Sequence, residues 1–326
     1  MDASDAPGRS CPVTYRYSPT VFQRPAEIEA ETLYVIGGLY GNPFALDAVD
    51  ELAAGEQVFP TPVFNGDFNW FNVDAEGFAQ LNARVLAHVA LRGNVETELA
   101  TDDERAGCGC AYPEWVGDAE VARSNEIAAR LRGTARALPA LREQLGRLPM
   151  HAVAVVGGIR VGIVHGDAWA LAGWQFSQER LADDLAAAAS ACDEAEVGIF
   201  ACSHTCLPVL QVLATARGPC MIANNGAAGM PNFRGTRFGL ITRISTRPRA
   251  DALYGERLGP VYVDAVAARY DHERWLAHFD AAWPAGSAAA VSYRRRIADG
   301  PAYEPRHAVR GHVRQALAPR PTATIA

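Results

Sequence analysis

The stretch Val63-Phe64-Asn65-Gly66-Asp67 joins a short apolar run, typical of a buried strand, to a loop that starts with a carboxylate. Three further stretches follow apolar runs of their own: Gly93-Asn94, His165-Gly166 and Ser203-His204-Thr205. Strand-end loops are where α/β folds collect ligand-binding residues. One carboxylate, one amide and two imidazoles suit a divalent cation such as Mn(II), Fe(II) or Zn(II). We therefore expect Asp67, Asn94, His165 and His204 to share one metal site.

The order of these stretches resembles the calcineurin-like metallophosphoesterases. The family pattern runs D-x-H-G-N, G-D, G-N-H/C-D/E, H-G and G-H-T-H. The corresponding segments here read Gly38-Leu39-Tyr40-Gly41-Asn42, Gly66-Asp67, Gly93-Asn94-Val95-Glu96, His165-Gly166 and Ser203-His204-Thr205-Cys206. A closing segment, Asn225-Gly226-Ala227-Ala228-Gly229-Met230-Pro231, looks like the N-P-G-S-x-G-x-P segment of the smaller bacterial members. The resemblance covers residues 33 to 244 or so, most of the chain.

The resemblance implies a pair of metals that share one bridging carboxylate. Asp67 corresponds to that bridge, and the ligands of the second metal are retained as Asp67, Asn94, His165 and His204. Because the departures fall on the other metal and spare this one, we expect a divergent member with one ion, Mn, Fe or Zn. Two ions remain an alternative.

The first metal has lost three ligands of the family pattern. Gly38 stands for the Asp and Tyr40 for the His of D-x-H, and Cys206 stands for the last His of G-H-T-H. One interpretation is that Tyr40 fills a vacated space and Cys206 is a small buried apolar residue. The other is that Tyr40 or Cys206 binds an altered first metal, with phenolate favouring a ferric ion and thiolate a softer one.

Four more residues are expected beside the substrate or behind the ligands: Asn42, Glu96, Cys108 and Cys110. Two cysteines two positions apart point in opposite directions in an extended loop, which is poor for chelating one ion. One of them could still reach the site. Many family members place a general acid, His, directly after G-N, where this chain has Val95. Glu96 and His151 are the candidates to replace it.

The resemblance implies an α/β fold, a four-layer α-β-β-α sandwich of two mixed sheets. The alternation of strand-like and helix-like segments agrees with it. We expect an irregular N-terminal arm over residues 1–31 and the metallophosphoesterase-like domain over 32–250. A helical insert at about 98–145 should cap the metal site. Residues 251–326 are expected to form a helical extension and a tail that is loose after about Pro305.

Charge and cysteine content narrow the class of protein. The formal net charge is -7 and no strongly basic face is evident, which argues against a nucleic-acid partner. No apolar run reaches the 18 or so residues of a membrane span, and no signal peptide is visible. Seven cysteines lack the spacing of a disulfide framework. We expect a reduced, cytoplasmic protein whose partner is a small-molecule substrate.

These features together predict a metal-dependent hydrolase of the phosphoesterase type that acts on a small phosphate-containing substrate. Two alternatives stay open. One is a repurposed single-metal enzyme of different chemistry. The other is a non-catalytic metal-binding protein that kept the fold, since fold does not decide function.

Overall fold

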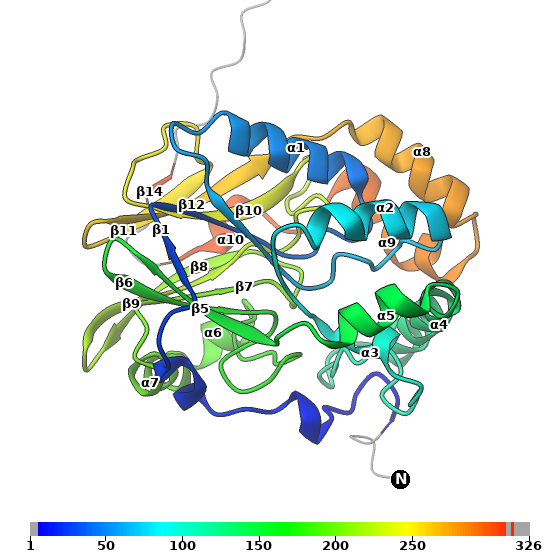
Figure 1. The fold of residues 1–326 in the computed structure, drawn as a ribbon, viewed down its shortest axis with the longest axis horizontal. Coiled ribbons are helices and arrows are strands. Elements are labelled where there is room, and N and C mark those ends of the chain that lie inside the picture. Colours follow the sequence, from blue (N-terminus) through cyan, green and yellow to red (C-terminus); the bar gives the residue numbers. More distant parts are fainter. Residues whose placement is uncertain (1–5, 311–313, 316–326) are drawn as a thin grey trace, which may run out of the picture.

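The structure is a computed structural model, which describes residues 6–310 and 314–315. Its core is a pair of mixed sheets packed face to face (Figure 1). In one sheet, here called the first sheet, the order is β1 (Ile28–Ala30), β5 (His151–Val156), β6 (Ile159–Val164), β7 (Ile199–Cys202), β9 (Gly218–Asn224), β8 (Val209–Thr215) and β13 (Val309–Arg310). The second sheet runs β14 (Arg314–Gln315), β11 (Tyr254–Leu258), β12 (Val261–Ala268), β10 (Gly239–Ser245), β2 (Thr32–Ile36), β3 (Thr61–Asn65) and β4 (Val89–Leu91).

Helices cover the outer faces of both sheets. Over the second sheet lie α1 (Pro43–Ala54), α2 (Ala75–Val85) and α8 (His272–Ala282), while α6 (Arg180–Asp183) and α7 (Leu185–Ala195) lie beside the first sheet (Figure 1). Successive side chains of a strand point to opposite faces. In β2, accordingly, Tyr34 and Ile36 pack in the core under the helices, whereas Leu33 and Val35 pack in the core between the sheets. The predicted α-β-β-α sandwich is confirmed.

The carboxyl ends of the strands converge on one edge of the sandwich. Strands β2, β3 and β4 are parallel to one another, and β6 is parallel to β7. Backbone amides of Ser203 and His204 donate to the carbonyl of His165 at 3.1 and 3.0 Å, which joins the loops after β7 and β6. The loops that carry the four expected ligands therefore start from neighbouring strand ends.

Both sheets extend beyond the expected domain boundaries. Strand β1 lies inside the supposed arm of residues 1–31 and pairs in parallel with β5. The supposed extension from residue 251 contributes β11 and β12 to the second sheet before α8 and α9 (Ala288–Asp299) begin. For β1 the physical reason is that a three-residue edge strand carries too little periodicity to be seen in sequence, whereas β12 is an eight-residue inner strand that the sequence analysis missed. Much of the tail expected to be loose lies outside the described residues.

The insert expected at about 98–145 contains the end of α3 (Asn94–Ala100), all of α4 (Asp118–Arg136) and all of α5 (Pro139–Gly146). The part of it that lies beside the expected ligands is a loop. The Thr134 hydroxyl on α4 donates to the carbonyl of Val73 at 2.9 Å, so this helix rests on the core domain. Between α3 and α4, the loop brings Cys110 and Tyr112 to the cavity described below. The covering residues thus come from a loop that the helices hold.

The cysteines differ from the expected reduced state. Disulfides join Cys108 to Cys110 and Cys192 to Cys220, and Cys11, Cys202 and Cys206 are free. Cys192 lies on α7 and Cys220 on β9, so only the folded chain brings these two residues together. Sequence spacing could not reveal such a pair.

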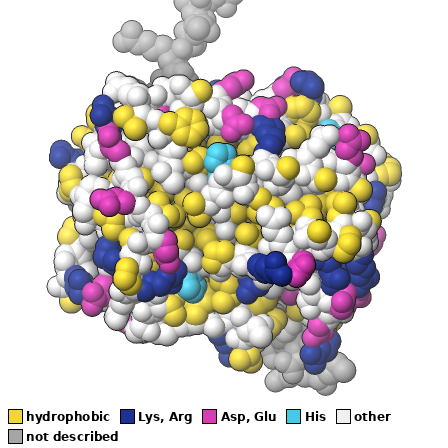
Figure 2. Space-filling view, viewed as in Figure 1, with side chains coloured by type: hydrophobic (Ala, Val, Ile, Leu, Met, Phe, Trp, Pro, Cys, Tyr) yellow, Lys and Arg dark blue, Asp and Glu magenta, His cyan; other side chains and the backbone are white. Residues whose placement is uncertain are grey.

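The surface carries no dominant charge on the face seen in Figure 2. Acidic and basic side chains are interspersed there, with apolar groups between them. This mixture agrees with the modest net charge of -7 and gives no footprint for a polyanion on that face. Among the described helices, none combines the length and the hydropathy that a membrane crossing needs.

Candidate metal centre

Asp67 and Asn94 enter the site from the loops after β3 and β4. Asp67 has a positive φ of 55° and accepts a hydrogen bond from the Val95 amide at 3.1 Å. Asn94 is the first residue of α3. A Cβ at Gly93 would lie 2.3 Å from the Asp67 carboxylate, so only glycine allows the two loops to approach this closely.

The four expected ligands meet in one place. His165 Nε2 lies 3.1 Å from Asn94 Oδ1, 3.3 Å from Asp67 Oδ1 and 3.1 Å from His204 Nδ1. One ligand atom from each of Asp67, His165 and His204 falls within 4.8 Å of the others. All four side chains are at least nine-tenths buried.

The hydrogen bonds behind these ligands decide which atoms face the centre. His165 Nδ1 bonds the carbonyl of Asn65 at 2.9 Å, and His204 Nε2 bonds the carbonyl of Cys110 at 3.0 Å. Asn94 Nδ2 donates to the carbonyl of Cys108 at 2.9 Å. Because a carbonyl oxygen only accepts, each of these nitrogens carries the hydrogen.

The atoms left to face inward are His165 Nε2, His204 Nδ1, Asn94 Oδ1 and the Asp67 carboxylate. Each presents a lone pair, and no hydrogen lies between them in these tautomers. Four buried lone pairs at this separation repel one another unless a metal cation, or a proton on His165, lies among them. The carbonyl that fixes each imidazole is the partner that metal-binding histidines commonly have. The donor set therefore fits a divalent ion with two nitrogen and two oxygen ligands.

Asp67, His165 and His204 shift one another's pKa values. Burial would raise the pKa of Asp67, but the neighbouring His165 lowers it overall. Burial would lower the pKa of His165, and the Asp67 carboxylate raises it instead. Burial first, and the charge of His165 second, lower the pKa of His204 to about 3. His204 is thus held in the neutral form that metals bind.

Glu96 supports the ligand loops from behind. Its carboxylate accepts hydrogen bonds from the backbone amides of Asp67, Gly93 and Phe68 at 2.8, 3.0 and 3.1 Å. Burial, and secondly the charge of Asp67, raise its pKa to about 7. Since these bonds use both oxygens and Glu96 does not line the cavity, it holds the ligand loops in place.

We expect Glu96→Ala to lower the free energy of unfolding by roughly 3 kcal/mol or more. The change leaves several buried backbone amides without an acceptor, and each such loss costs about 1–3 kcal/mol. Urea denaturation followed by circular dichroism measures this change. Glu126→Ala, at an exposed position of α4, is the control and should change stability by less than about 0.5 kcal/mol. Equal stability of the two variants would contradict the supporting role.

Side chains fill the positions that the family pattern assigns to a first metal. Tyr40 Oη lies 2.8 Å from Cys206 Sγ, and either atom can be the donor. A Cβ at Gly38 would lie 2.9 Å from the Tyr40 ring, so the phenol takes up space beside Gly38. Burial raises the pKa of Tyr40 well above its usual value and raises that of Cys206. Two neutral groups that bond each other agree with the interpretation that they fill the vacated space.

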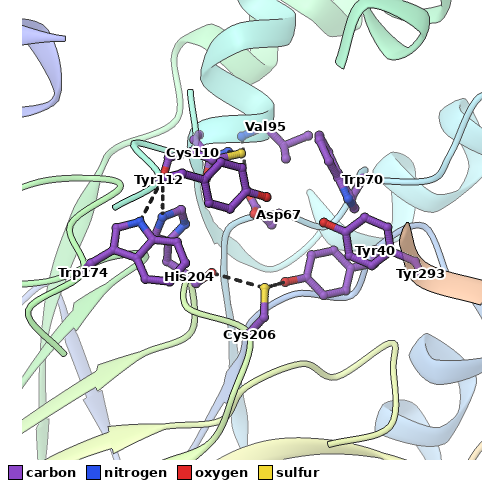
Figure 3. Close-up of a pocket in the computed structure, with 11 residues that line it drawn as sticks. Tyr40, Asp67, Trp70, Val95, Cys110, Tyr112, Trp174, His204, Cys206 and Tyr293 are labelled. Carbon is purple, nitrogen blue, oxygen red and sulfur yellow. Dashed lines mark hydrogen bonds between the residues drawn. The ribbon is translucent and has the colours of Figure 1, made fainter. Parts of the chain in front are cut away.

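A small aromatic cavity opens beside the ligands (Figure 3). Its volume is about 40 Å³. It is lined by Tyr40, Asp67, Trp70, Asn94, Val95, Cys110, Tyr112, Trp174, His204, Cys206 and Tyr293. Because a single water needs about 10–15 Å³ by this measure, the cavity has room for an ion with one or two waters. A phosphoryl group enters only if some of the aromatic side chains move.

The sequence did not indicate the aromatic part of this wall. Trp70 follows the Asp67 loop, Tyr112 and Trp174 come from two other loops, and Tyr293 lies on α9. The one signal in the sequence was the segment Gly107–Pro113, in which two glycines alternate with two cysteines before Tyr112. Tertiary packing alone brings the other aromatic residues to the ligands.

The other residues that were expected near the substrate do not all lie at the cavity. Asn42 caps α1 by accepting from the Ala45 amide at 3.0 Å, and it donates to the Gly229 carbonyl at 3.0 Å, so its role is structural. His151 lies on β5 with its Nδ1 2.9 Å from Arg24 and is absent from the cavity wall. Val95 does line the cavity, and its side chain is apolar.

The expectation that Cys108 and Cys110 point apart is wrong. Gly109 between them adopts a left-handed φ of 67°, which turns both side chains to the same side and allows the disulfide. Among the described residues, the non-glycine positions with positive φ are Tyr40, Asp67, Ala111, Glu196 and Cys206. All but Glu196 lie at the cavity or next to Cys110. Backbone strain of this kind clusters at functional sites.

Comparison with solved structures identifies the architecture. A hypothetical protein from Pyrococcus horikoshii superposes with a TM-score of 0.56 at 15% identity, over 85% of this chain and 100% of that one. A metallophosphoesterase from Sphaerobacter thermophilus superposes with a TM-score of 0.52 at 18% identity, over 83% and 100%. The chain has the metallophosphoesterase fold. The resemblance read from the motifs is thus confirmed for the fold. No family model and no curated protein sequence matches this chain.

Proposed function

We propose that this protein is a metal-dependent phosphoesterase that uses one divalent ion to hydrolyse a small phosphate-containing molecule. The observation that carries the proposal is the set of four convergent lone pairs at the strand ends of a metallophosphoesterase fold. A bound ion supplies Lewis acidity toward a phosphoryl oxygen and lowers the pKa of a coordinated water. Asp67, Asn94, His165 and His204 hold that ion and are the residues on which activity depends.

The chain's own side chains set the conditions for this chemistry. Trp174 packs on His204 with ring centroids 5.3 Å apart, and Tyr112 packs on Trp174 at 5.8 Å. These rings exclude bulk water from the ligands, which strengthens electrostatic interactions inside the cavity. The protonated Tyr40 hydroxyl at the cavity wall can donate to a phosphoryl oxygen in place of the lost metal.

A groove beside the cavity supports a small anionic substrate. Its volume is about 590 Å³, and Trp174 lines both spaces. Arg16 and Arg180 line the groove and bond neutral partners, a Cys11 carbonyl at 3.5 Å and a Gln175 side-chain oxygen at 3.2 Å.

The groove's own carboxylates are already occupied. Asp167 accepts from the Trp169, Ala170 and Gln175 amides at 2.8, 2.9 and 3.0 Å, and Asp184 caps α7. Among the described residues neither arginine forms an ion pair, so both can bind a second anionic group on the leaving side of the substrate.

We expect the double change of Arg16 and Arg180 to Ala to raise KM about tenfold for a substrate with an anionic leaving group and to leave kcat nearly unchanged. The reason is that groups remote from the reacting atoms contribute uniform binding. Steady-state kinetics measure both constants. Arg294→Ala, on the exposed surface of α9, is the control. A fall in kcat with constant KM would contradict the assignment.

A screen of phosphomonoesters and phosphodiesters tests the proposed activity. The protein is loaded with Mn(II), Fe(II) or Zn(II), and its metal content is measured in the same samples. Turnover that disappears with a chelator and returns with the ion supports the proposal. One ion per chain without turnover on any ester would contradict it.

The small size of the cavity favours a second candidate. A volume of about 40 Å³ admits no phosphoester until the aromatic wall moves, and two neutral residues stand where a second ion would be. Both features suit a non-catalytic protein that keeps one ion. In the screen, this candidate predicts a bound ion and no hydrolysis.

A further inference from the structure

The loop Cys108-Gly109-Cys110 holds two of the four ligands. The Cys108 carbonyl accepts from Asn94, and the Cys110 carbonyl accepts from both His204 and Trp174, the latter at 2.9 Å. Consequently, a change in the conformation of this loop would also change the orientation of Asn94 and His204.

The loop is itself held firmly. Asn125 Oδ1 accepts from the Cys108 amide at 2.9 Å, and Arg132 donates to the Gly107 carbonyl. A Cβ at Gly109 would lie 2.5 Å from the Tyr15 hydroxyl, so the turn packs tightly against its surroundings. The sulfur atoms therefore stay beside the metal ligands whether or not they are bonded to each other.

Cys110 lines the cavity, and its sulfur contacts the side-chain amide of one ligand, Asn94. The distance from the sulfur to Asn94 Nδ2 is 3.6 Å, and the same cavity is lined by Asp67, Asn94 and His204. Cys110 is 6% exposed and Cys108 0%, so a reductant meets the disulfide only after some of the aromatic side chains of the cavity move.

We propose that Cys110 becomes an additional metal ligand when the Cys108–Cys110 disulfide is reduced, so that the redox state of this loop sets which ion the centre prefers. The inference rests on the proposed metal centre and is independent of hydrolysis. Two molecules of a thiol R–SH reduce the disulfide, giving two cysteine thiols and R–S–S–R. Cys110 then loses its proton to a solvent base as its sulfur binds the ion.

The chemistry of sulfur gives the direction of the change. In the disulfide, Cys110 Sγ is neutral and bonded to Cys108, and the centre offers two nitrogens and two oxygens. In the reduced loop, it adds a soft anionic thiolate. Thiolate favours Zn(II) and Co(II) over Mn(II). Reduction should raise Zn(II) affinity at least about tenfold, in the range of changes to a ligand environment, and leave Mn(II) affinity nearly constant.

Co(II) absorption spectroscopy tests the proposal directly. Cobalt bound to a thiolate shows a ligand-to-metal charge-transfer band, and its visible d–d bands report binding itself. The reductant is a phosphine, which takes up one water and becomes the phosphine oxide. The oxidised protein should show d–d bands alone, and the reduced protein should add the charge-transfer band.

Variants identify the sulfur responsible. Cys108→Ser should show the charge-transfer band without reductant, and Cys110→Ser should lack it in both states. Cys206→Ser and Cys192→Ser are the controls for the other cysteines and should behave as the unchanged protein.

Three outcomes would overturn the proposal: reduced protein that binds Co(II) without the band, a band that survives in Cys110→Ser, or a band lost in Cys206→Ser. Absence of d–d bands in every sample would overturn the metal centre as well. A sulfur band without ester hydrolysis would refute only the proposed phosphoesterase activity.

Discussion

His165→Ala and His204→Ala should each lose almost all of the bound ion. Each change deletes one of only two imidazole ligands, and the remaining set of one nitrogen and two oxygens holds a borderline cation poorly. Cys206→Ala should keep the ion, because its sulfur bonds Tyr40 and lies outside the ligand cluster. Elemental analysis of purified protein, with circular dichroism to show folding, measures the ratio of ion to chain.

A matched control and two outcomes make this experiment decisive. His278→Ala removes an exposed histidine of α8 that stacks on Trp275, and it should keep the full ion content. Loss of the ion in Cys206→Ala would mean that the first metal site has been rebuilt around sulfur. Retention of the ion in His204→Ala would mean that the motif assignment of this chain is wrong.

The convergence of the four expected ligands could be predicted from sequence because each of them lies within three residues of a strand end. Asp67 and His165 come straight after apolar runs, and the carboxyl ends of neighbouring strands meet at one edge of the sandwich. The place of each ligand in the sequence, just after a strand, therefore predicted its place in the fold. The aromatic residues of the cavity wall have no such relation to a strand end: Tyr293, for example, lies on a helix beyond the end of the family resemblance near residue 244.

The loop cysteines show a second limit. The alternation rule for an extended chain placed the Cys108 and Cys110 side chains on opposite sides. A single left-handed glycine between them reverses that geometry. Sequence showed the glycine without its φ, and φ depends on the packing of Gly109 against Tyr15 and Glu98. The domain boundaries near residues 31 and 251 were missed for a related reason. Strands β1 and β11 are recognised by their hydrogen bonds to β5 and β12, which the sequence does not show.

The triple variant Gly38→Asp, Tyr40→His and Cys206→His should restore a second ion and raise hydrolysis of an aryl phosphate by at least about 100-fold. The gain comes from the paired clamp on the attacking and leaving oxygens, which contributes several kcal/mol at about 1.4 kcal/mol per factor of ten. Metal content should rise from one ion per chain to two. The single variant Tyr40→His is the control and should bind one ion.

The backbone favours this restoration. Gly38, Tyr40 and Cys206 have φ values of 63°, 53° and 62°, a left-handed region in which Asp and His are enriched and other side chains are strained. The clash of a new Gly38 side chain with the Tyr40 ring disappears because both change together. Arg296, which donates to the Cys206 carbonyl, opposes a second cation, so Arg296→Gln added to the triple variant should tighten the second ion further. A folded triple variant that still binds one ion would show that the site was lost through more than its ligands.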